Sequence, residues 1–160
     1  MSFDPRQFVS AIGSVLTAAG LFSPAAVRLL AGTAAVESAF GTFLRQKADG
    51  PALGVFQMEP ATEEDIWSNY LAYRPKLSTN VWGLAGVDRP DATHLQLNLI
   101  YQILMARIHY LRVKAPIPDT GDPAVLGRYW KDHYNTTMGK GHVAHFVTAW
   151  DRYRLAGVCP

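Results

Sequence analysis

The first apolar positions of the chain recur with the spacing of one face of an α-helix. Between residues 5 and 19 these positions are Phe8, Ala11, Ile12, Val15 and Leu16. Intervals of three and four residues place such side chains on one stripe of a helix. We therefore predict an amphipathic helix over residues 5–19 that ends near Gly20, because glycine readily adopts the conformation that follows a helix end.

A second apolar stretch follows Ser23 and Pro24. Serine is a preferred N-cap and proline is accepted in the first helical turn, so this pair predicts a helix start. Residues 25–40 are then almost wholly apolar until Glu37. A helix that is apolar on all sides has to be buried on all sides. We predict that this helix is central to the fold and that its last turn carries Glu37 into the interior.

The regular spacing of apolar residues is lost between residues 41 and 58. Gly41, Gly50, Pro51 and Gly54 interrupt this segment, and glycine and proline are the strongest markers of turns. The short run of residues 53–58 fits either a strand or an extended turn. We expect at most a small β-hairpin here.

Helical patterns return after residue 58. Glu59 and Pro60 predict a helix start, with acidic residues in the first turn where the helix dipole favours them, and Pro75 is expected to end this helix. Residues 76–90 are predicted to form a loop. Asp91 is predicted to cap one long helix that extends through Leu111.

The last part of the chain predicts two further helices. One begins at Asp122 and Pro123 and ends near Asn135, and the other runs from about Lys140 to Tyr153. The sum is a mainly α fold of about six helices. With no linker, repeat or low-complexity segment, we predict a single domain over residues 1–160.

The composition is that of a globular domain. Apolar residues make up 49% of the 160 residues and charged residues 18%, which excludes a disordered chain. The formal net charge of +2 comes without a Lys/Arg-rich run, so we expect no nucleic-acid partner. We also expect no membrane span and no signal peptide. Cys159 is the single cysteine, so an internal disulfide is impossible.

Glu37 is the first candidate for chemistry. Cleavage of a glycosidic bond requires a proton on the leaving oxygen, and a carboxylic acid donates one near neutral pH when burial raises its pKa. Glu37 fits this demand because the helix before it carries no charge after Arg28. The structural alternative is an ion pair between Glu37 and a residue such as Arg45.

Glu37 and Ser38 are also the first of three short motifs. The second is Gly-Val-Phe-Gln-Met-Glu-Pro-Ala-Thr at residues 54–62, and the third is the pair Tyr134 and Asn135. In order and approximate spacing they resemble the signatures of the lytic transglycosylase and goose-type lysozyme superfamily. That group has a Glu-Ser pair, a Gly-Leu-Met-Gln-like turn followed by Pro-Ala-Thr, and a Tyr-Asn pair.

The resemblance implies a lysozyme-like fold and cleavage of peptidoglycan glycan strands between N-acetylmuramic acid and N-acetylglucosamine. By position, Glu37 is implied as the general acid and then the base, without a cofactor or a metal ion. In the transglycosylases of this group the carboxylate takes a proton from the muramic 6-hydroxyl, which gives a 1,6-anhydro product without water. The implied substrate-binding residues are Ser38, which also supports the helix end, Phe56, Gln57, Tyr134 and Asn135.

The middle motif, in which Glu59 precedes Pro60, is closest in style to lysozyme-like proteins of tailed-phage particles. This implies an enzyme of the virion that opens the host cell wall during infection, with other tail or virion proteins as its partners. The third motif departs from the family, because Asn135 is followed by Thr136 and Thr137 where alanine and glycine are common.

Two other functions are compatible with the sequence. A hydrolytic muramidase needs a second carboxylate about 6.5–9.5 Å from the acid when it inverts, and Asp49 is the first candidate, ahead of Glu59 and Asp65. A structural tail or neck protein with a lysozyme-like fold and little or no activity is the other. Most of the tryptophan and tyrosine residues are predicted to lie in the core, and Trp82, in a predicted loop next to Gly83, is the first candidate among them for a sugar-stacking surface.

Overall fold

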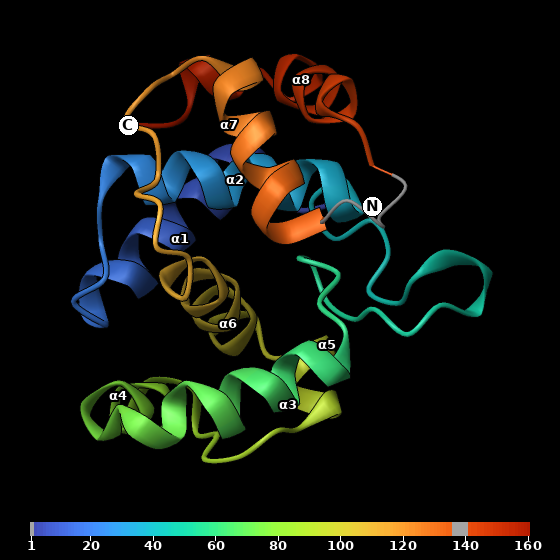
Figure 1. Ribbon diagram of the computed structural model, residues 1–160. Coiled ribbons are helices and arrows are strands. Elements are labelled where there is room, and N and C mark those ends of the chain that lie inside the picture. The colour runs from blue at the N-terminus through green and yellow to red at the C-terminus, as the bar shows by residue number, and fades with distance from the viewer. Residues whose placement is uncertain (1, 136–140) are drawn as a thin grey trace.

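Eight α-helices make up most of the computed structural model, which describes residues 2–135 and 141–160. In chain order they are α1 Pro5–Ala18, α2 Pro24–Ser38, α3 Pro60–Asn69, α4 Pro75–Ala85, α5 Ala92–Leu97, α6 Leu99–Leu111, α7 Pro123–Trp130 and α8 Val143–Arg152. Within the described residues there is no strand, and two isolated bridges join Leu53 to Arg45 and to Met58. The fold is therefore all-α (Figure 1), as predicted, and the possible hairpin is reduced to these bridges.

Helix α2 is the central helix of one part of the fold. Ser23 starts it, because its Oγ accepts a 3.1 Å hydrogen bond from the amide of Ala26. The helix ends where Ala39 adopts a left-handed φ of 52°. Helices α1, α6, α7 and α8 pack against α2, and most of its side chains are buried. The predicted central position of this apolar helix is confirmed.

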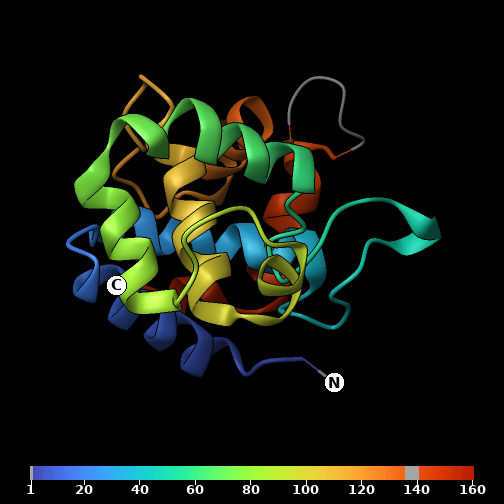
Figure 2. The same cartoon turned by 90° about the horizontal axis from the view of Figure 1, so that it is seen from below.

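Helix α6 joins two hydrophobic clusters. The first is built on α1, α2, α7 and α8, and the second on α3, α4 and α5. Figure 1 shows α6 between these two groups, and Figure 2, the view from below, shows α3 and α4 in front of it. Helix α6 contributes Ile103, Ala106 and Tyr110 to the first cluster and Tyr101, Met105 and Ile108 to the second. Its two opposite faces are thus both buried, which gives the two groups of helices a common support.

Two predictions for the middle of the chain are wrong. Residues 76–90 do not form a loop, because α4 begins at Pro75. A first-turn proline loses no helical hydrogen bond, so it starts a helix as readily as it ends one. The predicted long helix after Asp91 is divided at Asn98, whose Oδ1 accepts a 3.2 Å hydrogen bond from the amide of Tyr101 and caps α6. Apolar spacing continues across this break and therefore does not reveal it.

The C-terminal helices close over α2. Helix α7 continues into a π-helical turn, Lys131–Asn135, which agrees with the predicted end near Asn135. The predicted start of the last helix at Lys140 lies outside the described residues. A Cβ atom on Gly32 would lie 2.1 Å from Cζ of the buried Phe146, so the missing side chain lets α8 approach α2.

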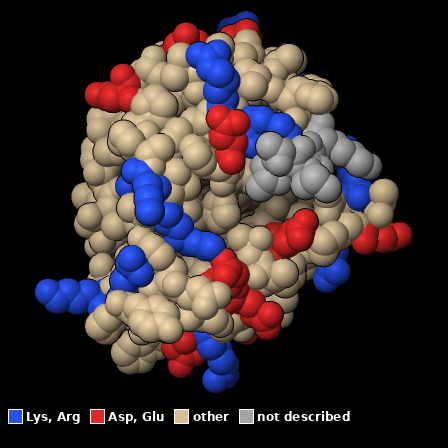
Figure 3. Space-filling model, viewed as in Figure 1, with Lys and Arg blue, Asp and Glu red and all other residues tan. Residues whose placement is uncertain are grey.

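The surface carries charges of both signs. On the face shown in Figure 3, lysine and arginine side chains lie among aspartate and glutamate side chains, with a short run of basic side chains on the left. Among the helices of the described residues, none combines the length and apolar character needed to cross a membrane.

Candidate active site

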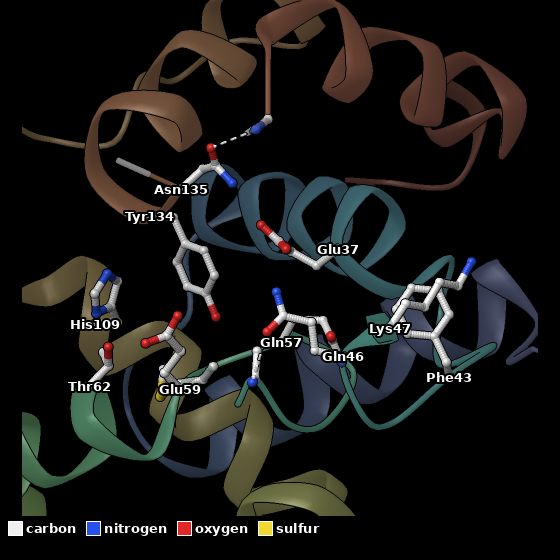
Figure 4. A pocket seen from close by; sticks show the side chains of 13 residues that line it. Glu37, Phe43, Gln46, Lys47, Gln57, Glu59, Thr62, His109, Tyr134 and Asn135 are labelled. Carbon is white, nitrogen blue, oxygen red and sulfur yellow. Dashed lines mark hydrogen bonds between the residues drawn. The ribbon is translucent and has the colours of Figure 1, made fainter. Parts of the chain in front are cut away.

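A cleft of about 700 Å³ opens between the end of α2 and the start of α3. Its walls come from α2, the following loop, α3, α6 and the π-helical turn, and its lining residues are Glu37, Phe43, Gln46, Lys47, Ala52, Gln57, Met58, Glu59, Thr62, His109, Tyr134, Asn135 and Gly141. Figure 4 shows Glu37 between an end with His109 and Thr62 and an end with Phe43 and Lys47. Parts of all three sequence motifs thus meet in one cavity.

Glu37 lies in the last turn of α2 and is partly buried. Its Oε1 accepts a 2.9 Å hydrogen bond from Nε1 of Trp130. Burial raises the pKa of the Glu37 carboxyl from 4.5 to about 7, although the hydrogen bond from Trp130 lowers it. A carboxyl with this pKa keeps its proton on a large fraction of molecules at neutral pH, which is the property that a general acid needs.

No cation holds Glu37 within the described residues. The two ion pairs found there join Arg28 to Asp119 and Arg112 to Asp65. The structural alternative, in which Glu37 pairs with Arg45, is therefore wrong. This matters for the chemistry, because a neighbouring positive charge would stabilise the carboxylate and lower the pKa of Glu37.

Ser38 does not line the cleft. Its side chain is fully buried, and its Oγ donates a 2.6 Å hydrogen bond to the carbonyl of Val55. The same oxygen accepts a 2.8 Å hydrogen bond from the amide of Gly41. The expected support of the helix end is confirmed. Direct contact between Ser38 and a ligand is excluded in this arrangement, because the side chain has no access to the cleft.

The turn at residues 54–57 places Gln57 in the cleft wall. Gly54 has a φ of 75°, and a Cβ atom there would lie 2.4 Å from the carbonyl oxygen of Leu95 and 2.6 Å from Oε1 of Gln102. Gln102 Oε1 also accepts a 2.7 Å hydrogen bond from the amide of Val55. Gln57 has a φ of 47°, and its Nε2 donates to the carbonyl of Gly54 at 2.8 Å. The turn is thus held from behind, with the Gln57 side chain on the cleft side (Figure 4).

Phe56 requires a second correction. Only 2% of its surface is exposed, and its ring packs 6.1 Å from the ring of Phe8 in the core. The side chain therefore points away from the cleft and offers no surface to a substrate. Its backbone has a different role, because the Phe56 carbonyl accepts a 2.8 Å hydrogen bond from the hydroxyl of Tyr134.

Tyr134 and Asn135 reach the cleft from the π-helical turn. The Tyr134 hydroxyl bond to Phe56 joins the third motif directly to the second, and burial together with the charge of Glu37 raises the pKa of Tyr134 well above its usual value. Asn135 Oδ1 accepts hydrogen bonds from Lys131 Nζ at 2.9 Å and from the amide of Gly141 at 3.1 Å. Both residues line the cleft beside Glu37.

Asp49 lies outside the cleft. It is exposed in a short 3-10 turn, Lys47–Asp49, and it is not one of the lining residues. Glu59, the next candidate for a second carboxylate, does line the cleft, and Figure 4 shows it across from Glu37. Asp65 is engaged in the ion pair with Arg112. Asp49 thus belongs to a turn, and Glu59 is the carboxylate that lines the cleft together with Glu37.

The sequence-based prediction did not assign Trp130 or His109 to the site. Trp130 supplies the hydrogen bond to Glu37, although its apolar spacing is that of an ordinary core residue. His109 lines the cleft, its Nε2 lies 3.0 Å from the carbonyl of His133, and its ring centroid lies 4.9 Å from that of Tyr134. Burial lowers the pKa of His109 to about 4, so the ring is neutral at pH 7 and supports the turn that carries Tyr134.

Trp82 is exposed but distant from this chemistry. It lies on α4 and lines a separate hollow of about 520 Å³ with Trp67 and Pro75. It is 60% exposed, and neither Glu37 nor the other motif residues line this hollow. Within the described residues, no group of three His, Cys, Asp or Glu side chains is arranged to hold a metal ion.

Comparison with known proteins returns no relative. No protein-family model, no curated protein and no solved structure matches this chain. The functional assignment therefore rests on the geometry of the cleft and on the motifs that form it.

Proposed function

We propose that this protein is a lysozyme-like lytic transglycosylase that cleaves peptidoglycan glycan strands between N-acetylmuramic acid and N-acetylglucosamine. The observation that carries this proposal is the carboxyl of Glu37, which lies in the cleft with a pKa raised to about 7. Its hydrogen-bond donor is the neutral indole of Trp130. Such a carboxyl is able to act as an acid and then as a base near neutral pH.

The proposed reaction uses one carboxyl in two steps. Protonated Glu37 donates its proton to the glycosidic oxygen, and the bond from that oxygen to C1 of the muramic ring breaks. The resulting carboxylate then takes the proton of the muramic 6-hydroxyl, whose oxygen bonds to C1. The products are a 1,6-anhydro sugar and a shortened strand, and Glu37 ends protonated as it began.

The other polar groups of the cleft suit a sugar rich in hydroxyl and acetamido groups. Gln57, Tyr134 and Asn135 all line the cavity with Glu37. Each is partly rather than fully buried, and each already has a partner on the protein that holds its side chain in place. Side chains held in this way lose little freedom when a ligand binds.

Hydrolysis is the second candidate function, and Glu59 is the observation that favours it. This carboxylate lies across the cleft from Glu37, so it is the group able to hold a water against the sugar in a muramidase. Asp49 no longer serves this alternative, because it is exposed outside the cleft.

One experiment separates these functions. Purified wild-type, Glu37→Gln and Glu59→Gln proteins are incubated with peptidoglycan, and the soluble products are identified by mass spectrometry. For a transglycosylase, the wild type and Glu59→Gln release 1,6-anhydro-muropeptides and Glu37→Gln releases none. Reducing-end products that are lost in Glu59→Gln identify a hydrolase. The absence of soluble products from the wild-type protein would contradict both and favour a structural tail or neck protein.

The proposed location is the phage particle, and its support is the resemblance of the middle motif to tailed-phage proteins. The enzyme would then act on the cell wall of the host during genome entry. Peptide mass spectrometry of purified particles tests this location, and absence of the chain from the particle would contradict it.

A further inference from the structure

The loop of residues 43–52, here called the Lys47 loop, forms one end of the cleft. Phe43, Gln46 and Lys47 all line the cavity, and Figure 4 shows Phe43 and Lys47 at the end opposite His109. Lys47 is the only lysine or arginine among the described residues that line the cleft. Among the described lining residues, the lysine charge therefore lies at this end.

The Lys47 loop is closed by specific contacts. The amide of Gln46 donates a 2.9 Å hydrogen bond to the carbonyl of Ala52, and the amide of Ala52 donates a 3.2 Å bond to Gln46 Oε1. A Cβ atom on Gly50 would lie 2.0 Å from the same Oε1, so the Gln46 side chain fills the space that a larger residue would need. The loop is thus built around Gln46, and this arrangement determines where the next residue, Lys47, is placed.

The Lys47 ammonium group contacts an aromatic ring and forms no ion pair with a described carboxylate. Its Nζ lies 4.6 Å from the centroid of the Phe43 ring, within the range of a cation–π contact. The ion pairs of the described residues do not include it. A cation that rests on an aromatic face keeps its charge available, because the ring supplies no carboxylate partner.

We propose that the Lys47 loop is the subsite for the acidic sugar of the strand, with Lys47 binding a carboxylate carried by N-acetylmuramic acid. This inference rests on the proposed function. The two sugars of the strand differ in that muramic acid has a lactyl group, whose carboxyl is either free or extended by a peptide that has carboxylates of its own. N-acetylglucosamine has neither. The Lys47 cation at this end of the cleft therefore distinguishes the two sugars and sets the orientation of the strand across Glu37.

The test measures binding rather than turnover, in a Glu37→Gln background that leaves the ligand intact. Isothermal titration calorimetry is performed with three soluble tetrasaccharides: strand fragments with stem peptides, the same fragments with free lactyl carboxylates, and an oligomer of N-acetylglucosamine. We expect Lys47→Gln to weaken binding of the carboxylate-bearing fragments about three- to fivefold, as for an exposed ion pair. Binding of the N-acetylglucosamine oligomer should not change.

Two variants serve as controls. Lys47→Arg retains the charge and should restore binding, and Lys76→Gln removes an exposed lysine on α4 that does not line the cleft. A loss confined to the fragments with stem peptides identifies a peptide carboxylate as the partner, and a loss confined to the fragments with free lactyl groups identifies the lactyl carboxylate. A loss for both acidic fragments identifies a subsite that accepts either carboxylate. An equal loss for all three ligands, or no loss for any, overturns the inference and leaves the proposed function intact. Failure of the Glu37→Gln protein to bind any of them contradicts the proposed function itself.

Discussion

Nε1 of Trp130 donates a 2.9 Å hydrogen bond to Oε1 of Glu37 and thereby connects α7 to the end of α2. Two opposing effects meet at this carboxyl. Burial favours the protonated form and raises the pKa, whereas the indole donor stabilises the carboxylate and lowers it. Trp130 therefore limits how far the pKa of Glu37 rises and keeps it near 7, where both the acid and the base forms are available.

Replacement of Trp130 by phenylalanine should move the pH dependence of activity. The change removes the donor but keeps an aromatic ring, so the pKa of Glu37 should rise by about one unit. Because the first step uses protonated Glu37, the rate should begin to fall at a higher pH than in the wild type. Clearing rates of a cell-wall suspension between pH 5 and pH 9 measure this shift.

Trp150→Phe is the matched control for that experiment, since Trp150 is also buried but lies in the core against Phe146. Trp150→Phe should lower the free energy of unfolding without changing the pH at which the clearing rate begins to fall. If the clearing rates of Trp130→Phe and the wild type begin to fall at the same pH, the indole of Trp130 does not act on Glu37.

Glu37→Gln should strongly reduce activity and increase stability at alkaline pH. The pKa of Glu37 in the folded protein is about 7 and the unperturbed value is 4.5, so the folded state binds the proton more tightly than the unfolded state. The stabilisation is complete below pH 4.5 and is lost as the pH rises through 7. Glutamine removes this loss, which amounts to at most about 3 kcal/mol at pH 8.

Urea unfolding at pH 5 and pH 8 tests the stability part of this prediction. The variant should be close to wild type at pH 5 and more stable at pH 8, while its rate falls by about 10²–10⁴-fold, the usual contribution of a general acid. If the variant and the wild type have equal free energies of unfolding at pH 5 and also at pH 8, the Glu37 carboxyl has an ordinary pKa.

Ser38→Ala should destabilise the protein, although Ser38 does not touch the cleft. The change leaves the carbonyl of Val55 and the amide of Gly41 without their hydrogen-bond partner, which costs about 1–3 kcal/mol for buried groups. Ser14→Ala, an exposed substitution in α1, is the control and should change the free energy of unfolding by less than about 0.5 kcal/mol. Equal urea midpoints for the two variants would contradict a structural role for Ser38.

Two glycine substitutions test the tight turn behind Gln57. Gly54 and Gly86 have almost the same φ, 75° and 71°, so alanine is strained by a similar amount at both. A Cβ atom at Gly54 would meet Leu95 and Gln102 at 2.4 and 2.6 Å, whereas a Cβ atom at Gly86 would meet nothing within 4 Å. Gly86→Ala should cost about 1–2 kcal/mol, and Gly54→Ala should cost more by at least about 1 kcal/mol. Thermal unfolding of both proteins measures the difference, and similar melting temperatures would show that the turn is free to move.

The parts of the fold that the sequence predicts are those determined by interactions between residues close together in the chain. Helices α1 and α2 begin directly after Asp4 and Ser23, because each of these side chains caps the helix that follows it, and such caps act over three residues. The burial of Glu37 follows from the apolar helix before it. The missed parts depend on context instead, since Pro75 begins a helix as well as it ends one, and the division at Asn98 lies within continuous apolar spacing.

By itself, the sequence determined that the fold is helical, that α2 is buried, and that Glu37 lies in the last turn of α2. It also showed that a turn with a glutamine and a Tyr-Asn pair follow Glu37 along the chain. The tertiary structure decided which of these side chains face the cleft. It turned Ser38 and Phe56 inward, left Asp49 on an exposed loop, and brought Trp130 to Glu37 across 93 positions of sequence. The physical reason is that helix periodicity and capping are local, whereas the direction of a side chain relative to a cavity depends on how distant elements pack.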